Sequence, residues 1–140
     1  MVRRLLQKNF PVVFVSGKAG TGKSTLISWL RHVFPGNLAI VAPTGVAALN
    51  VGGVTIHSFF QFPPHLIRPK DVKELANRRL YKKLDLLIVD EVSMVRPDIM
   101  DGMDLFLRKN GRDPNLPFGG AKLLLVGDLF QLPPVVERQE

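Results

Sequence analysis

Eight residues near the start of the chain have the types and spacing of a loop that binds phosphate. Gly17 to Ser24 matches the pattern G-x-x-x-x-G-K-[ST] at every fixed position. Glycines allow a tight turn whose N–H groups point at phosphate oxygens, and the N-terminus of the following helix adds partial positive charge. Lys23 would reach the β- and γ-phosphates, and the Ser24 hydroxyl would ligate Mg²⁺. The predicted nucleotide-binding residues are Gly17, Ala19, Gly20, Thr21, Gly22, Lys23, Ser24 and Thr25.

Two adjacent carboxylates, Asp90 and Glu91, directly follow the apolar run Leu86 to Val89. At the end of a strand beside a phosphate loop, Asp90 is placed to hold Mg²⁺ through water, and Glu91 to polarise an attacking water. Such a pair also occurs at helix N-termini and in solvated turns. The strand before it and the loop upstream favour the metal interpretation, with Ser24 and Asp90 as the metal ligands.

A third polar element, Gln131, lies in the segment Gly127 to Pro134, after the last apolar run. A polar side chain there could touch the γ-phosphate and report its presence, although a proline-stiffened turn explains the segment equally well. The predicted catalytic residues are therefore Lys23, Glu91 and Gln131.

Short aliphatic runs alternate with helical patterns, which predicts an α/β fold with a parallel sheet and crossover helices. We expect strands over residues 12–15, 38–41, 84–89 and 122–126. Helices are expected over 22–34 and from residue 97 to the Asn110-Gly111 pair, with a short basic helix over 71–83 and a loop over 61–69.

The composition is typical of one globular domain: 140 residues, 46% hydrophobic and 22% charged. No apolar run reaches the roughly 18 residues that span a bilayer, and the run from Val12 to Val15 is too short for a signal peptide core. We expect a soluble intracellular protein with no membrane partner, in the nucleus, a mitochondrion or a bacterial cytoplasm. The absence of cysteine excludes disulfides, cysteine-ligated zinc and a thiol nucleophile.

Charge is unevenly distributed along the chain. The formal net charge is +7, and residues 1–70 hold eight Lys or Arg and no acidic residue, so the second half is close to neutral. Such a field favours a polyanion such as a nucleotide or nucleic acid. A surface kept soluble by basic side chains explains the excess equally well.

These segments together resemble the first motor lobe of superfamily 1 helicases, most closely the petite-integration-frequency (Pif) family of DNA helicases. The matching segments extend over nearly the whole chain: Gly17 to Thr25, Ala42 to Leu49, Gly52 to Phe59, Ile88 to Met94, Pro117 to Gly120 and Val126 to Val135. The resemblance implies a RecA-like three-layer α/β/α sandwich in which the last strand lies between the strand before Lys23 and the strand before Asp90. It also implies a motor that hydrolyses ATP with Mg²⁺ and moves 5′ to 3′ along single-stranded DNA.

The family's strand-binding segments map onto Thr44-Gly45 and onto Thr55 to Ser58, which implies nucleic-acid contacts by Thr44, Gly45, Thr55 and His57. Backbone and hydroxyl groups there would contact phosphates without reading sequence. Thr44 could also simply cap the helix after it, and His57 could be a hydrogen-bonded core histidine. The phenylalanines at 59, 60 and 62 are expected in the core rather than as stacking faces, and the basic cluster at 70–83 as a solvated helix face.

The family pattern is incomplete in this chain. Gln7 lies only ten residues before Gly17, too close for the family's adenine-contacting glutamine, and the second motor lobe is missing. We therefore expect residues 1–140 to be a truncated first lobe that needs the second lobe as a partner and does not unwind DNA alone. Two alternatives stay open: a nucleotide-gated module that binds single strands without useful turnover, and an NTPase that acts on protein.

Overall fold

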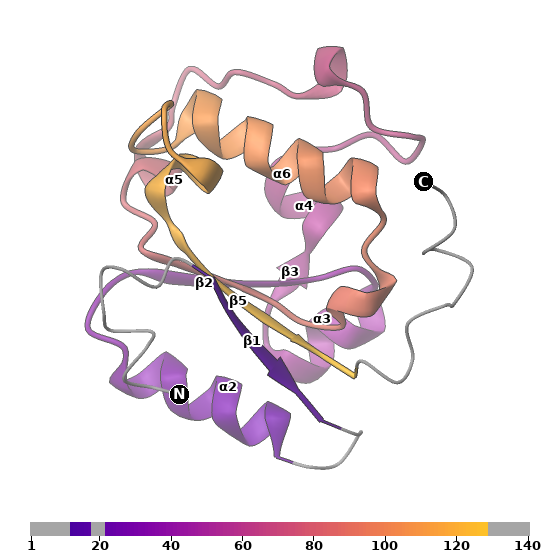
Figure 1. The fold of residues 1–140 in the computed structure, drawn as a ribbon, viewed down its shortest axis with the longest axis vertical. Coiled ribbons are helices and arrows are strands. Elements are labelled where there is room, and N and C mark those ends of the chain that lie inside the picture. Colours follow the sequence, from indigo (N-terminus) through magenta and orange to yellow (C-terminus); the bar gives the residue numbers. More distant parts are fainter. Residues whose placement is uncertain (1–11, 18–21, 129–140) are drawn as a thin grey trace.

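Five parallel strands form one sheet in the residues that the computed structural model describes, 12–17 and 22–128 (Figure 1). The strands are β1 (Val12–Ser16), β2 (Leu38–Ala42), β3 (Val54–Thr55), β4 (Leu86–Val89) and β5 (Lys122–Gly127). The helices are α2 (Lys23–Val33), α3 (Gly45–Val51), α4 (Ile56–Phe60), α5 (Arg79–Lys82) and α6 (Pro97–Asn110). The sheet order is β1-β5-β4-β2-β3, so β5 lies between β1 and β4 as predicted. β3 is a strand that the sequence did not predict.

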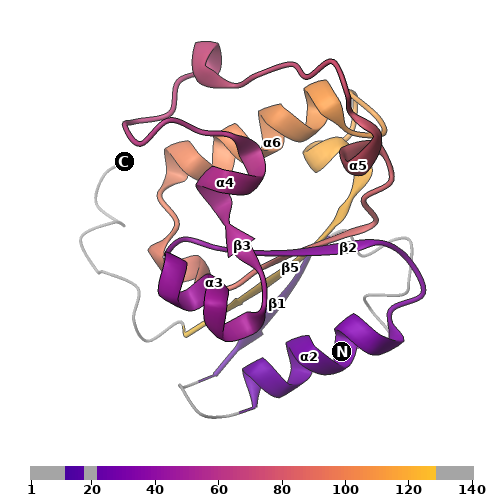
Figure 2. The same cartoon turned by 180° about the vertical axis from the view of Figure 1, so that it is seen from behind.

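Helices cover both faces of the sheet, which confirms the expected three-layer α/β/α arrangement. All four residues of β4 are buried, as in a parallel strand covered on both sides. Leu86 and Ile88 pack with the apolar residues of α2, whereas Leu87 and Val89 pack with those of α4 and α6. Figures 1 and 2 show α2 on one side of the sheet and α4 and α6 on the other.

The predicted basic helix over residues 71–83 is wrong over most of its length. Only α5 is α-helical there, preceded by a short 3-10 helix at Pro69–Asp71. The cause is the buried Asn110 of α6, whose side chain accepts from the N–H of Leu75 at 2.7 Å and donates to the carbonyl of Lys73 at 2.8 Å. These backbone groups are therefore used by α6 instead of by helical i→i−4 bonds.

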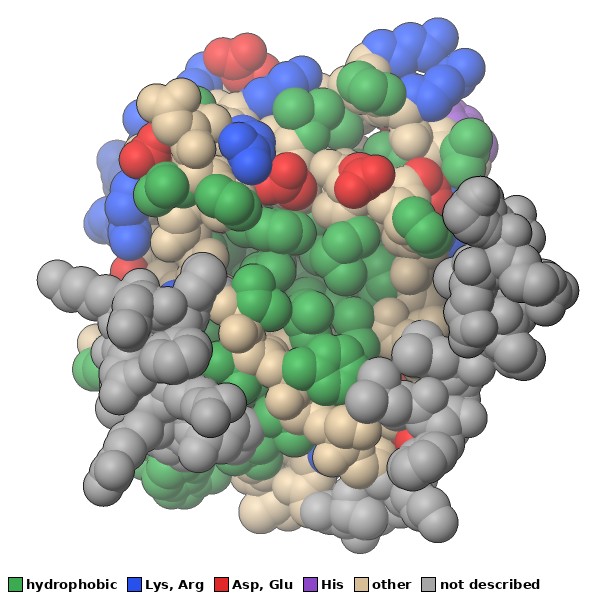
Figure 3. Space-filling model, in the orientation of Figure 1, with side chains coloured by type: hydrophobic (Ala, Val, Ile, Leu, Met, Phe, Trp, Pro, Cys, Tyr) green, Lys and Arg blue, Asp and Glu red, His purple; other side chains and the backbone are tan. Residues whose placement is uncertain are grey.

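One face of the molecule retains exposed apolar side chains. Val12 and Phe14 of the edge strand β1 are 50% and 42% exposed, and Figure 3 shows apolar side chains gathered on the face where β1 lies. None of the helices in the described residues has the length and apolarity required to cross a bilayer.

Candidate functional site

The carboxyl ends of the strands meet at one edge of the sheet, because every pairing is parallel. The next residues in the chain at this edge are Gly17 after β1, Asp128 after β5 and Asp90 after β4. Thr44 follows β2 by two residues, and Thr55 ends β3. Open parallel sheets bind their ligands outside this edge. The structure therefore brings together the phosphate loop, the acidic pair and the threonine segments.

The two ends of the phosphate loop are held close to each other. The Gly17 N–H donates to the carbonyl of Gly127 at 3.2 Å, which fixes the start of the loop to the end of β5. Lys23, the first residue of α2, donates from Nζ to the Gly17 carbonyl at 2.6 Å. Its ammonium thus lies at Gly17, where the predicted phosphate loop begins.

The start of α2 suits an anion. Its N-cap, Gly22, has φ 91°, in the left-handed region that favours glycine, and has no side chain to accept bonds from the first-turn N–H groups. No acidic residue lies in the first turn, so the partial positive charge of the helix end is not offset there. Ser24 and Thr25 are exposed on this turn, where their hydroxyls are accessible. Ala19, Gly20 and Thr21 lie outside the described residues.

Asp90 is a half-buried carboxyl beside this lysine. Burial raises its pKa above the ordinary value, and the N–H of Glu91 and the charge of Lys23 offset part of that rise. Lys23 begins α2 and Asp90 directly follows β4, and the charge of the lysine acts on this carboxyl across the carboxyl edge of the sheet. A cation placed near Asp90 would favour its charged form.

These residues fit a Mg²⁺ site of the kind that is completed by nucleotide. Mg²⁺ prefers oxygen ligands and is usually held by one or two carboxylates together with substrate phosphates and water. Asp90 supplies a carboxylate with raised pKa, and Ser24 an exposed hydroxyl on the first turn of α2. Within 12–17 and 22–128 no cluster of three or more potential metal-binding His, Cys, Asp or Glu is present, so a metal held by protein carboxylates alone is not indicated there.

Glu91 adopts a strained backbone conformation that its sequence neighbours do not predict. Its φ of 52° and ψ of 44° lie in the left-handed region, where a residue other than glycine costs about 1–3 kcal/mol. The chain turns sharply there into the 3-10 helix Val92–Met94, which packs closely on Gly127. A Cβ added at Gly127 would lie 3.0 Å from Cγ1 of Val92. The turn directs the chain away from the sheet immediately after Asp90.

Asp128 is an acidic residue at this edge that the sequence motifs did not single out. It directly follows β5 and is only 9% exposed, between the ends of β1 and β4. The signal was available, because an acidic residue follows an apolar strand in the same way as Asp90 does. Gln131, the predicted sensor, lies outside the described residues, so its placement stays a prediction.

The two threonines proposed for nucleic acid lie at the carboxyl ends of the paired strands β2 and β3, and each caps a helix. Thr44 Oγ1 accepts from the N–H of Ala47 at 3.2 Å at the start of α3. Thr55 Oγ1 accepts from Ser58 at 3.1 Å at the start of α4, and Thr55 is paired with Ala42 in the sheet. The capping role is thus confirmed for Thr44. A hydroxyl that accepts this bond can still donate its proton to a phosphate oxygen, so capping and DNA contact are compatible. Nothing lies within 4 Å of a Cβ built on Gly45, so the first turn of α3 is open.

The aromatic residues near His57 belong to the core, as expected. Phe60 and Phe62 are buried and stack at 5.5 Å between ring centroids, and Phe59 packs against them. His57 itself is half-buried, with its ring edge-on to Phe62 at 6.3 Å. The rings of Phe60 and Phe62 are therefore buried away from any base, and Phe59 is partly buried against the same core.

Comparison with known proteins places these features in a family. The model of the PIF1-like helicase family matches residues 1–140. The chain is 39% identical to the ATP-dependent DNA helicase PIF1 of Saccharomyces cerevisiae over 93% of its length, but it spans only 16% of that relative. It is also similar to the crystal structure of Pif1 from Bacteroides sp in complex with ADP-AlF4, with 43% identity and a TM-score of 0.79 over 99% of this chain and 33% of that one. A Bacteroides Pif1 structure with ADP-AlF3 and ssDNA matches with 42% identity and a TM-score of 0.79 over the same shares.

Proposed function

Because the chain belongs to the PIF1-like helicase family, we propose that it is the ATP-binding lobe of an ATP-dependent DNA helicase. The whole protein would couple hydrolysis of Mg-ATP to 5′-to-3′ translocation on single-stranded DNA. The observation that carries the proposal is the shared edge of the sheet, which holds the Lys23 loop, the Asp90-Glu91 pair and the threonine caps of α3 and α4.

The nucleotide chemistry follows from the described side chains. The Lys23 ammonium, which donates to the Gly17 carbonyl in this structure, would donate instead to β- and γ-phosphate oxygens when nucleotide binds. These oxygens are charged and therefore stronger acceptors. Ser24, and Asp90 through water, would hold Mg²⁺, which would supply charge stabilisation for the phosphates. Glu91, two residues after β4, would accept a proton from the water that attacks the γ-phosphorus as the bond from that phosphorus to the ADP oxygen breaks. Gln131 is proposed to sense the γ-phosphate.

The strand would bind along the starts of α3 and α4. Their first turns offer N–H groups and the hydroxyls of Thr44 and Thr55 to phosphate oxygens, a mode that does not depend on sequence. The Bacteroides relative was crystallised with ssDNA, which supports a strand site in this family. His57 is proposed to contribute from the first turn of α4.

Relatives are several times longer than this chain, which spans 15 to 20% of the fungal PIF1 and RRM3 helicases. We propose that a second motor lobe completes both the ATP site and the strand groove, and that the chain alone does not separate strands. The two alternatives, a gated binding module and an NTPase acting on protein, gain no support from the PIF1 and RRM3 relatives, which are named ATP-dependent DNA helicases.

An assay with a forked duplex and an oligothymidine strand tests this proposal. The protein that carries both lobes is expected to release phosphate from Mg-ATP at least tenfold faster with oligothymidine and to separate the fork, whereas residues 1–140 alone separate nothing. A rate of phosphate release that does not change with oligothymidine would contradict the proposal of a DNA-dependent motor. Robust strand separation by residues 1–140 would contradict the need for a second lobe.

A further inference from the structure

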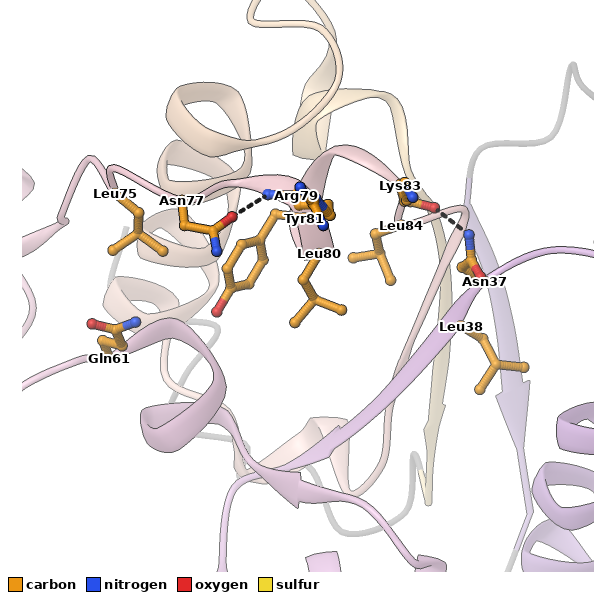
Figure 4. A pocket seen from close by; sticks show the side chains of 10 residues that line it. All are labelled: Asn37, Leu38, Gln61, Leu75, Asn77, Arg79, Leu80, Tyr81, Lys83 and Leu84. Carbon is orange, nitrogen blue, oxygen red and sulfur yellow. Dashed lines mark hydrogen bonds between the residues drawn. The ribbon is translucent and has the colours of Figure 1, made fainter.

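A hollow of about 610 Å³ lies at the amino edge of the sheet, opposite the candidate nucleotide site (Figure 4). Leu38, which begins β2, lines it together with Leu84, which lies two residues before β4. At roughly 3.3 Å per strand residue, Leu38 is about 13 Å from the Ala42 end of β2. We call this hollow the α5 groove, because α5 forms one of its walls. A ligand held there would leave the nucleotide edge accessible.

The inner surface of the α5 groove is apolar. Leu75, Leu80 and Leu84 line it, and Leu80 is 60% exposed although it lies on a helix that packs against the core. Figure 4 shows Leu80 and Tyr81 pointing from α5 toward β2 and α4. Tyr81 is only 8% exposed, and its hydroxyl donates to the Phe59 carbonyl at 2.6 Å, so it serves as a fixed wall.

Hydrogen bonds within the fold hold the polar rim in place. Asn37 donates to the Lys83 carbonyl at 3.1 Å, and the Asn77 side chain accepts from the N–H of Arg79 at 3.2 Å. The walls are thus tied to β2 on one side and to α5 on the other. A groove with fixed walls binds with a smaller loss of conformational entropy than one that must be ordered first.

Positive charge surrounds the opening without a matching acid. Arg79 and Lys83 line the groove, Lys82 lies between them in sequence, and none of the three takes part in an ion pair within the described residues. The nearby acids have other partners: Glu74 pairs with Arg78 at 2.7 Å, and Asp85 pairs with Arg112 at 2.8 Å. The free charge is complementary to an acidic ligand.

The adjoining edge of the sheet, along β2, is only partly paired. β3 pairs with β2 only at Val41 and Ala42, so Leu38 and Ala39 have no strand partner on that side among the residues described. An extended chain can add to such an edge while its alternate side chains enter neighbouring pockets.

We propose that the α5 groove binds an extended acidic peptide of a partner protein, with leucine-like side chains inside and carboxylates on Arg79 and Lys83. Nucleic acid is less well matched, because binding of single strands relies on exposed aromatic faces and the only ring lining the groove is the buried Tyr81. This site is independent of the nucleotide and strand sites proposed above.

Fluorescence anisotropy with three labelled probes tests the site: a peptide of alternating leucine and glutamate, the same peptide with lysine for glutamate, and an oligothymidine. The acidic peptide is expected to bind at least tenfold more tightly than the basic one. The double reversal Arg79→Glu with Lys83→Glu should weaken it at least tenfold, and Leu80→Ala several-fold. The matched controls, Lys70→Glu with Lys73→Glu and Leu66→Ala, change exposed residues outside the groove and should alter the affinity less than twofold.

Equal affinity for the acidic and the basic peptide would overturn the proposal. So would an equal loss of affinity for the acidic peptide in the Arg79→Glu/Lys83→Glu variant and in its Lys70→Glu/Lys73→Glu control. Displacement of the acidic peptide by oligothymidine, with the same dependence on Arg79 and Lys83, would reassign the groove to nucleic acid. Circular dichroism of each variant separates loss of binding from loss of fold, and Leu80 is exposed enough for its truncation to leave the core intact.

Discussion

Nζ of Lys23 lies 2.6 Å from the carbonyl oxygen of Gly17, so the first residue of α2 reaches back to the residue that follows β1. Gly17 is itself bonded to Gly127 at the end of β5. The lysine therefore connects α2 to the β1–β5 pair at the place where phosphate is proposed to bind. A phosphate that takes over this ammonium replaces a neutral acceptor with a charged one, and this exchange is the basis of the proposed nucleotide affinity.

Glu91→Gln is expected to separate binding from hydrolysis. The amide keeps the size of the side chain but does not accept a proton from water, so Mg-ATP should bind within about twofold of the native affinity while turnover falls by about 10² or more. Phosphate release and nucleotide titration in the two-lobe protein measure both quantities. Hydrolysis at the native rate in this variant would show that Glu91 is not the base.

Asp90→Asn is expected to stabilise the fold at neutral pH in the absence of Mg²⁺. Burial raises the pKa of Asp90, so the folded state holds its proton more tightly than the unfolded state and loses stability as pH rises through the folded pKa. The asparagine side chain of the variant does not ionise, so the variant should keep the free energy of unfolding that the native chain loses. The difference in stability between the two should disappear as pH falls below 3.8, the ordinary pKa of an aspartate.

Urea unfolding at a series of pH values, in the presence of a chelator, measures the difference between Asp90→Asn and the native chain. Asp101→Asn, an exposed acid on α6, is the matched control and should show no comparable advantage. An Asp90→Asn chain that is less stable than the native one at neutral pH would contradict the account.

Thr44→Asp is expected to separate capping from strand binding. Aspartate caps a helix as well as threonine does, so the free energy of unfolding should change by less than about 0.5 kcal/mol. Its negative charge opposes a DNA phosphate, so the affinity for oligothymidine should fall at least fivefold. Asn50→Asp adds the same charge near the far end of α3, where salt screens it over a Debye length of about 8 Å, and should have a smaller effect. Equal losses in the two variants would argue against contact at Thr44.

Asn110→Ala is expected to destabilise the chain by about 2 kcal/mol or more. Asn110 is fully buried, and its removal leaves the N–H of Leu75 and the carbonyl of Lys73 without their partner. Asn115→Ala, on an exposed turn, should lie within about 0.5 kcal/mol of the native chain. Urea unfolding gives both values, and an Asn110→Ala chain as stable as Asn115→Ala would contradict this explanation of the 71–83 segment.

The sequence predicted the elements whose signals are local. The strands β1, β2, β4 and β5 are runs of aliphatic residues, and α2 and α6 carry clear helical periodicity with recognisable ends. Hydrophobic runs do not reveal β3, because its two residues become a strand only by pairing with Val41 and Ala42. The helix predicted over 71–83 was wrong for a similar reason, because a tertiary contact decides the conformation. The Asn110 side chain of α6 bonds the backbone N–H and C=O groups that a helix would have paired.

Among the site residues, the motif predicted Lys23 and Asp90 near each other, and the structure brings both to one edge. The left-handed backbone of Glu91 was not predictable, since nothing in its neighbours demands that conformation. Asp128 was predictable on the same ground as Asp90, because each is an acidic residue that directly follows an apolar strand. The motif in that segment pointed instead to Gln131. A polar residue directly after an apolar parallel strand is thus positioned at the ligand-binding edge of the sheet by the strand alone.

The most direct test of the central claim is the affinity of this chain for a fluorescent ATP analogue with Mg²⁺, compared between Lys23→Ala and Lys73→Ala. Hydrogen bonds to charged groups contribute about 1.5–3 kcal/mol, a factor of roughly 10 to 100 in affinity. The account predicts saturable binding that weakens at least tenfold in Lys23→Ala and is unchanged in Lys73→Ala, an exposed lysine far along the sequence from the loop. Equal affinity in the two variants would contradict the assignment of the phosphate site.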